Sequence, residues 1–170
     1  DAPLAERRAQ ALSLDPELLR DLLGEDELRK LLNPQAIAQV EAELQRLHPD
    51  RQIRHPEGLH DALRALGHLS PSAIAERCEG EQDGQAWIQQ LLSQRKALDV
   101  RIAGVRQLIA VEDSARYRDA LGVVLPPGLA SVWLESPPAP LRDLVQRYAR
   151  THGPFTQGSL SSWLGLPPAQ

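Results

Sequence analysis

The stretch Glu57–Asp113, EGLHDALRALGHLSPSAIAERCEGEQDGQAWIQQLLSQRKALDVRIAGVRQLIAVED, decides the fold. Its first part holds three groups of apolar residues at helical spacing, which predicts three short helices. The pair Ser70-Pro71 marks the start of the second helix, because serine is a good N-cap and proline suits the first helical position. The groups are Leu59, Leu63 and Leu66; Ile74; and Trp87, Ile88, Leu91 and Leu92.

The apolar period changes after the third predicted helix. Leu98, Val100 and Ile102 alternate with polar residues, which is typical of a strand with one buried face. Ala103-Gly104 interrupts the run, and a second β-prone run follows at residues 108–111. We therefore predict an antiparallel hairpin over about 97–104 and 105–112, although a short apolar run is also compatible with a buried helix.

Three helices followed by a hairpin is the element order of a winged helix, whose third helix usually enters the major groove of DNA. Glutamine can pair with adenine edges and arginine can hold guanine or phosphate, so exposed residues of both types are candidates for contact. We expect contact from the third helix, from a basic strip that follows it, and from one tryptophan in a proline-flanked loop that could stack on a base. These candidates are Gln89, Gln94, Arg95, Lys96, Arg101, Arg106, Arg116, Arg118 and Trp133.

The charge distribution leaves two interpretations open. The 170-residue chain has a formal net charge of −4, which is unlike an independent basic nucleic-acid binder. Residues 95–118 nevertheless hold six basic side chains against Asp99, Glu112 and Asp113. This basic strip suits a phosphate backbone, but it is equally compatible with a solvated surface. Glutamine-rich helix faces and tryptophans on apolar stripes are also common without any ligand.

The segments around the winged helix predict four parts. Repeated cap-plus-proline signals, such as Asp15-Pro16 and Asn33-Pro34, indicate a helical block over residues 1–55. The winged helix takes residues 56–122, and a proline-rich connector takes 123–140. Residues 141–170 repeat the plan of two helices with a histidine-containing turn, so we expect them to begin a second, truncated winged helix that leans on the first. The chain would then be a piece of a longer protein.

Motifs for chemistry are not found in the sequence. It has no GxxxxGK[ST] loop, no CxxC and no HExxH, so neither nucleotide hydrolysis by that route nor a zinc site is expected. Its single cysteine, Cys78, excludes an internal disulfide and favours a reducing cytoplasm. No apolar run reaches the length of a membrane span, and we expect no membrane partner.

Three further stretches carry a family resemblance that covers nearly the whole chain. LSLDPELLRDLLGEDELRKLLNPQAIAQVEAELQRL (12–47), ARYRDALGVVLPPGL (115–129) and especially PLRDLVQRYARTHGPFT (140–156) resemble the region that follows the ATPase module in large helicase-related (Lhr) proteins. The resemblance implies a superfamily-two, ATP-dependent 3′-to-5′ helicase that acts on single-stranded DNA and RNA:DNA hybrids in DNA repair. Its RecA-like motor, with ATP and magnesium, would lie elsewhere in the same polypeptide.

The resemblance makes this chain an accessory domain without catalytic residues, cofactor or metal of its own. The domain is also similar to the tandem winged-helix fold of a class of bacterial DNA glycosylases, but no glycosylase signature is present to transfer. Two functions stay open. The chain either contacts nucleic acid beside the motor, or it is a structural brace or protein-docking module that contacts no nucleic acid.

Overall fold

The computed structural model of the chain describes residues 33–167. The chain forms two units, Asp1–Gln39 and Val40–Gln170, and the second contains almost all of the described elements. The helices expected before residue 33 lie outside the described residues. Helix α3 (Pro34–Leu44) ends three residues earlier than its apolar stripe predicts, because Arg46 adopts a left-handed backbone (φ 61°) and Leu47 N–H donates to Ala42 O.

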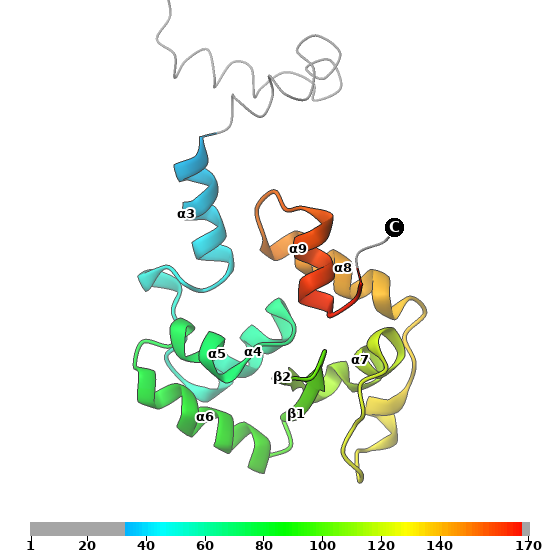
Figure 1. Cartoon of the computed structure of the whole chain (residues 1–170). Helices are drawn as coiled ribbons and strands as arrows, with labels where there is room; N and C mark the ends of the chain where they lie inside the picture. The colour runs from blue at the N-terminus through cyan, green and yellow to red at the C-terminus, as the bar shows by residue number, and fades with distance from the viewer. Residues whose placement is uncertain (1–32, 168–170) are drawn as a thin grey trace, which may run out of the picture. The chain divides into compact units, whose positions relative to one another are not determined.

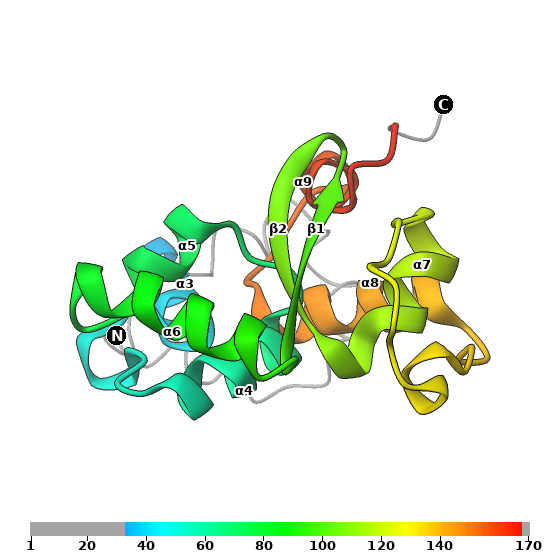
Figure 2. The same ribbon diagram turned by 90° about the horizontal axis from the view of Figure 1, so that it is seen from below.

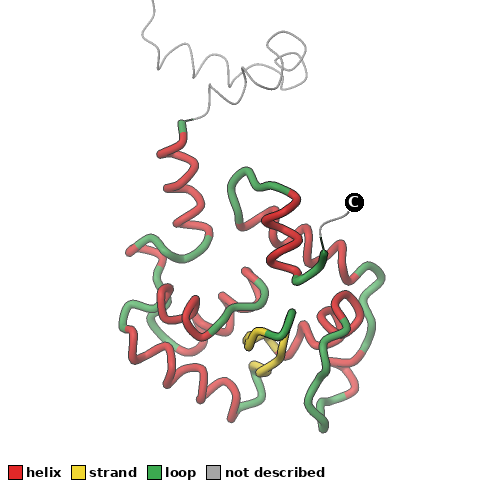
Figure 3. Tube along the Cα trace, viewed as in Figure 1, coloured by secondary structure: helices red, strands yellow, loops and turns green. Residues whose placement is uncertain are grey.

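The prediction of a mainly helical fold with one small antiparallel sheet is confirmed (Figures 1 and 3). Among the described residues, α3 is followed by three helices that lead into the hairpin, and three more helices follow it. Their bounds are α4 (Pro56–Leu66), α5 (Pro71–Arg77), α6 (Glu81–Ser93), β1 (Ala97–Ile102), β2 (Val105–Ala110), α7 (Ser114–Leu121), α8 (Pro140–Thr151) and α9 (Gln157–Leu164). Short 3₁₀ turns lie at Pro49–Arg51 (η1), Val111–Asp113 (η2) and Ser131–Leu134 (η3).

Local signals explain where these elements begin. The Ser70 hydroxyl accepts a hydrogen bond from Ala73 N–H at 3.1 Å, as the Ser-Pro signal predicts for the start of α5. His55 caps α4 in the same way, with Nδ1 accepting from Gly58 N–H at 2.9 Å. Helix α6 ends where Arg95 takes a left-handed conformation (φ 56°), which turns the chain directly into β1.

The hairpin is built as its sequence predicts. Strand β1 pairs with β2 so that Ile102 lies opposite Val105, and the two residues between them both have positive φ, as a tight primed turn requires. Leu69, between α4 and α5, forms an isolated antiparallel bridge with Leu108 of β2 through two hydrogen bonds of 2.8 and 3.1 Å. This bridge connects β2 of the wing with the segment that leads into α5.

Two hydrophobic clusters lie on opposite faces of the hairpin. Figure 2 shows α4, α5 and α6 on one side of the strands and α7 on the other. The first fills the space between α4, α5, α6 and one face of the strands, and it includes Ile53 before α4. The second joins the other face to α7, α8 and α9. Both faces of β2 are therefore covered near its end, which explains why residues 108–111 form a continuous apolar run rather than an alternating one.

Helices α8 and α9 pack onto the winged helix. Leu144 of α8 and Leu164 of α9 are buried in the second cluster with Val100 and Ile102 of β1. Gly165, just after α9, lies so close to the wing turn that an added Cβ would be 2.7 Å from the Cβ of Ala103. Helices α8 and α9 thus support the wing.

Candidate nucleic-acid interface

Beyond the exposed Asp83 in its first turn, the exposed face of α6 consists of neutral side chains. Gly84, Ile88 and Leu91 are buried against α4 and α5, which sets the orientation of the helix. The residues between them point to solvent and carry amide, methyl or hydroxyl groups. They are Gln85, Ala86, Gln89, Gln90 and Ser93. From Gln85 to Ser93 this face offers hydrogen-bond donors and acceptors and no acidic side chain, whereas Asp83 adds a negative charge at the start of the helix.

The end of α6 holds three of the predicted residues. Gln94 is exposed at the C-cap. The Arg95 guanidinium donates to Gly128 O at 3.0 Å, so it is tied to the loop after α7. The Lys96 ammonium lies 2.5 Å from a Glu57 carboxylate oxygen of α4. Lys96 therefore already has an anionic partner within the chain, whereas Arg95 is held only by a neutral carbonyl.

The wing tip brings two predicted arginines together. Arg101 and Arg106 are cross-strand partners next to the turn, and both are exposed. Arg106 donates to Asp99 Oδ2 through Nε and Nη2, at 2.8 and 2.7 Å. Arg101 donates only to Gly104 O, at 3.0 Å, and has no carboxylate partner among the described residues. A backbone phosphate at the tip would meet Arg101 without displacing an ion pair.

The basic strip does not form one surface, because its last two arginines belong elsewhere. Arg116 forms ion pairs with Asp113 and Asp143 and is only 23% exposed. Arg118 holds both oxygens of Asp119, at 2.6 and 3.0 Å, and reaches toward η3. Trp133 of η3 is half-buried against the second cluster. The structure thus places these three residues away from the wing tip, in contacts with α7, α8 and the connector.

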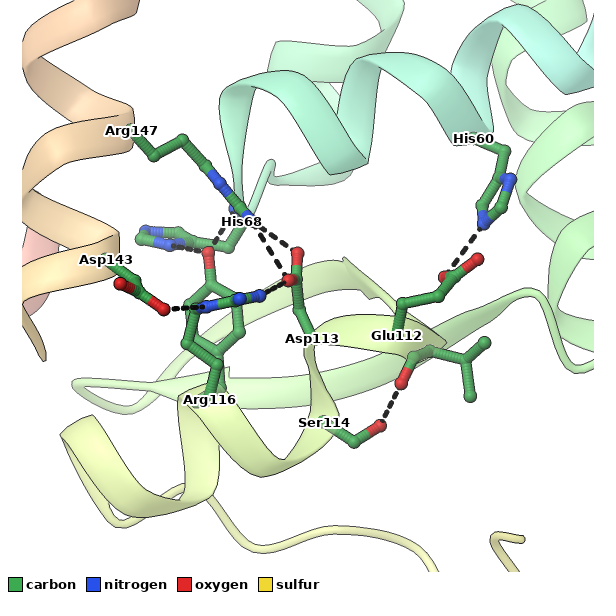
Figure 4. A network of polar contacts seen from close by, with 10 residues as sticks. His60, His68, Glu112, Asp113, Ser114, Arg116, Asp143 and Arg147 are labelled. Atoms are coloured by element: carbon green, nitrogen blue, oxygen red, sulfur yellow. Dashed lines mark hydrogen bonds and ion pairs between the residues drawn. The ribbon is translucent and has the colours of Figure 1, made fainter. Parts of the chain in front are cut away.

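A buried polar network joins the winged helix to α8 (Figure 4). Asp113 is 4% exposed in its side chain and binds both Arg116 and Arg147, the latter at 2.5 and 3.0 Å. Burial by itself would lower the pKa of Arg147, but the hydrogen bond and negative charge of Asp113 outweigh it and raise that pKa. The Arg147 guanidinium therefore stays charged, and both arginines connect Asp113, at the end of the wing, with α7 and α8.

The same network contains a neutral histidine. His68 N–H donates to the Tyr117 hydroxyl at 2.7 Å, and His68 Nδ1 lies 3.2 Å from that hydroxyl. Its ring stacks on Trp163 of α9, with centroids 4.3 Å apart. Burial lowers the pKa of His68 to about 4, and a backbone hydrogen bond with Trp163 offsets only part of this effect. The imidazole is therefore uncharged at neutral pH and serves packing rather than phosphate binding.

The histidine-containing turn after α8 is also a packing device. Tyr148 stacks on His152 at 3.6 Å and meets Phe155 edge-on at 4.8 Å. Gln45 donates to Thr151 O at 2.7 Å and accepts from Arg77 at 2.8 Å, which links this turn to α5. Residues of the RYARTHGPFT stretch therefore form packing contacts between α8 and the turn before α9, and a hydrogen-bond link through Gln45 to α5.

Metal and thiol chemistry find no support within residues 33–167. No group of three or more histidine, cysteine or acidic side chains is placed to hold a metal ion there. Cys78 caps α5 and is buried, and burial raises the pKa of its thiol to about 11. In the same part of the chain, no helix is both long and apolar enough to cross a bilayer.

Sequence reasoning missed three arginines that the fold brings to one place. Arg64 of α4 and Arg147 and Arg150 of α8 line a cavity together with Arg116. The only sequence signal was the basic side of the amphipathic 140–151 helix, since residues 64 and 150 are brought together by tertiary packing alone.

Comparisons with known proteins agree with this architecture. Residues 30–136 match a family model described as the winged-helix domain of large helicase-related protein. The chain is similar to a protein of Mycolicibacterium smegmatis named Lhr helicase/probable uracil glycosylase, with 48% identity over 98% of the chain. It is also similar to the Escherichia coli K12 protein named Lhr helicase/uracil glycosylase, with 47% identity over 98% of the chain. The matched region spans 11% of the length of each relative.

Proposed function

The chain belongs to the large helicase-related (Lhr) family as a winged-helix domain, and from that premise we propose that it contacts nucleic acid beside a helicase motor. The parent activity in this proposal is ATP-dependent 3′-to-5′ unwinding of duplexes, including RNA:DNA hybrids, in cytoplasmic DNA repair. ATP and magnesium belong to RecA-like domains of the same polypeptide, because the phosphate-loop motif that would bind them does not occur in this sequence. Base excision, which the relatives' names mention, is not proposed for this chain.

The observation that carries the proposal is the pairing of a neutral α6 face with arginines at the wing tip. The recognition helix of such a fold usually enters the major groove, and here the wing follows α6 directly in the chain. Gln89 is an exposed, uncharged residue of α6, and Arg101 has no carboxylate partner among the described residues. A strand held by these elements would receive base contacts from amides and phosphate contacts from guanidiniums.

The brace function has its own supporting observation. Lys96, Arg106, Arg116 and Arg118 all form ion pairs within the chain, so much of the basic strip is neutralised internally. A domain that only braced the motor would have basic side chains neutralised by internal ion pairs in this way. The two functions differ in what they require of the wing tip, because only nucleic-acid contact needs Arg101 and Arg106.

Changing Arg101 and Arg106 to Ala tests the proposal. Affinity of the full chain for a labelled single-stranded oligonucleotide would be measured by fluorescence anisotropy over a range of salt concentrations. Loss of two phosphate contacts should flatten the slope of log K against log salt by about 1.4. The charge-matched control is Arg51→Ala with Arg54→Ala, which removes two exposed arginines before α4. Equal affinity and slope for wild type and a folded wing variant would favour the brace.

A further inference from the structure

The cavity between α4, α7 and α8 is strongly basic. Its volume is about 330 Å³. Arg64 and Ala65 line it from α4, Arg116 from α7, and Asp143, Gln146, Arg147 and Arg150 from α8. Four guanidiniums thus converge on a space whose other charged lining group is a single carboxylate.

We propose that this arginine cavity is a second nucleic-acid site, which binds a backbone phosphate independently of the α6–wing surface. The inference rests on the proposed function only in taking nucleic acid as the ligand. The site itself is formed by different residues, on α4, α7 and α8 rather than on α6 and the hairpin.

Two of the arginines form a fixed floor. Asp113 holds Arg116 and Arg147, whose side chains are 23% and 16% exposed, and Asp143 lies 3.3 Å from Arg116 Nε. Arg116 uses Nε and Nη1 in these contacts, which leaves Nη2 without a partner among the described residues. A guanidinium that is already oriented loses little conformational freedom when it binds an oxyanion.

The other two arginines are free to close on a ligand. Arg64 and Arg150 are exposed, and neither forms an ion pair with any residue between 33 and 167. Counting Asp113 and Asp143 against the four guanidiniums leaves a net charge of +2 at the cavity. Because the chain as a whole carries −4, this local excess of positive charge singles the cavity out for an anion.

The chemistry of the lining selects a phosphate group. The planar fork of arginine matches two oxygens of a phosphodiester, and Gln146 adds a neutral amide beside the charges. The cavity is polar and wide enough for one phosphate with its adjoining sugar but offers no aromatic surface for a base. Contact there would position the strand without reading its sequence.

The test compares four double variants of the full chain in the same salt-dependent anisotropy assay with labelled single-stranded DNA. Arg64→Ala with Arg150→Ala removes the two mobile arginines and leaves the buried floor intact. We expect affinity about tenfold weaker or more at low salt, with a slope about 1.4 lower in magnitude. The control Arg51→Ala with Arg54→Ala should leave both quantities near wild type, and far-ultraviolet circular dichroism confirms folding.

Lysine substitutions separate charge from geometry. Arg64→Lys with Arg150→Lys should keep the salt slope of wild type but bind more weakly, since an ammonium cannot form the two-pronged contact. Competition with inorganic phosphate distinguishes the sources of the anion. If phosphate binds in a way that needs Arg64 and Arg150 while DNA affinity does not depend on them, the cavity is a small-anion site and the nucleic-acid inference is overturned.

The wing variant, measured in parallel, keeps the two conclusions apart. A wing variant with wild-type affinity beside a weakened cavity variant would overturn the α6–wing proposal and support the cavity. Weakening by the wing variant alone, with the cavity variant folded and unchanged, would overturn this inference and leave the proposed function intact. No binding by the wild-type chain at any salt concentration would overturn both.

Discussion

Lowering the pH should destabilise this fold through His68 in particular. The imidazole is 5% exposed, stacks on Trp163 of α9 and lies against the Tyr117 hydroxyl. Burial lowers its pKa from the usual 6.5 to about 4, so the folded chain holds it neutral where the unfolded chain would protonate it. A protonated ring could not keep these contacts without the cost of an isolated buried charge.

The sign and size of the pH effect on the free energy of unfolding follow from the linkage between proton binding and folding. The unfolded state binds more protons between pH 6.5 and 4, so stability is complete above the unfolded pKa and falls as the pH drops through this window. The difference between the ordinary histidine pKa of 6.5 and the folded-state pKa of about 4 corresponds to about 3 kcal/mol of unfolding free energy. About 2 kcal/mol of this is lost by pH 5.

Urea denaturation followed by far-ultraviolet circular dichroism, at several pH values from 7 to 4, measures the effect. Carboxylates also titrate in this range, so the quantity of interest is the difference in unfolding free energy between wild type and His68→Gln. The variant should be less stable than wild type at pH 7, and the difference should shrink by about 2 kcal/mol by pH 5. A difference that stays constant between pH 7 and 4 would refute the assignment of a neutral, buried His68.

Two further substitutions test the contacts that position the wing. Asp113→Ala leaves two half-buried guanidiniums without their shared carboxylate, and we expect a loss of about 3 kcal/mol in urea denaturation, where a loss below about 1 kcal/mol would contradict a structural ion-pair network. Gly165→Ala should cost about 1–3 kcal/mol, because its φ of 66° and the Cβ of Ala103 at 2.7 Å both oppose a side chain. Gly158→Ala, in an open helical position of α9, is the matched control and should be close to neutral.

The elements could be predicted from the sequence because each has a local cause. Ser70 caps α5 through its own hydroxyl, and the alternation of β1 follows from having one face in the second cluster. The turn at Ala103-Gly104 also lies where the break in the apolar pattern indicates. These signals need no knowledge of neighbouring elements, so the order of three helices and a hairpin was accessible from the residues alone.

The surface chemistry was less accessible, because it depends on partners distant in sequence. Arg116 is two residues from Arg118 and looks equally available, yet the fold turns it toward Asp143 of α8. Lys96 similarly meets Glu57, 39 residues earlier. A count of nearby charges cannot distinguish a cation that binds its own chain from one that is free to bind a ligand. At the wing tip, Arg106 pairs with Asp99, whereas the hydrogen-bond partner of Arg101 is the neutral carbonyl of Gly104.

The packing of α9 against the wing relates the brace and the nucleic-acid functions. Helix α9 buries Leu164 beside Ile102 and places Gly165 against Ala103, so the wing tip is supported on the side opposite Arg101. A supported wing holds its arginine at a defined position, which lowers the conformational cost of gripping a phosphate. In the proposed function, packing within the chain thus supports contact at the tip. A variant that loosens α9 is then expected to weaken nucleic-acid binding without changing Arg101 or Arg106.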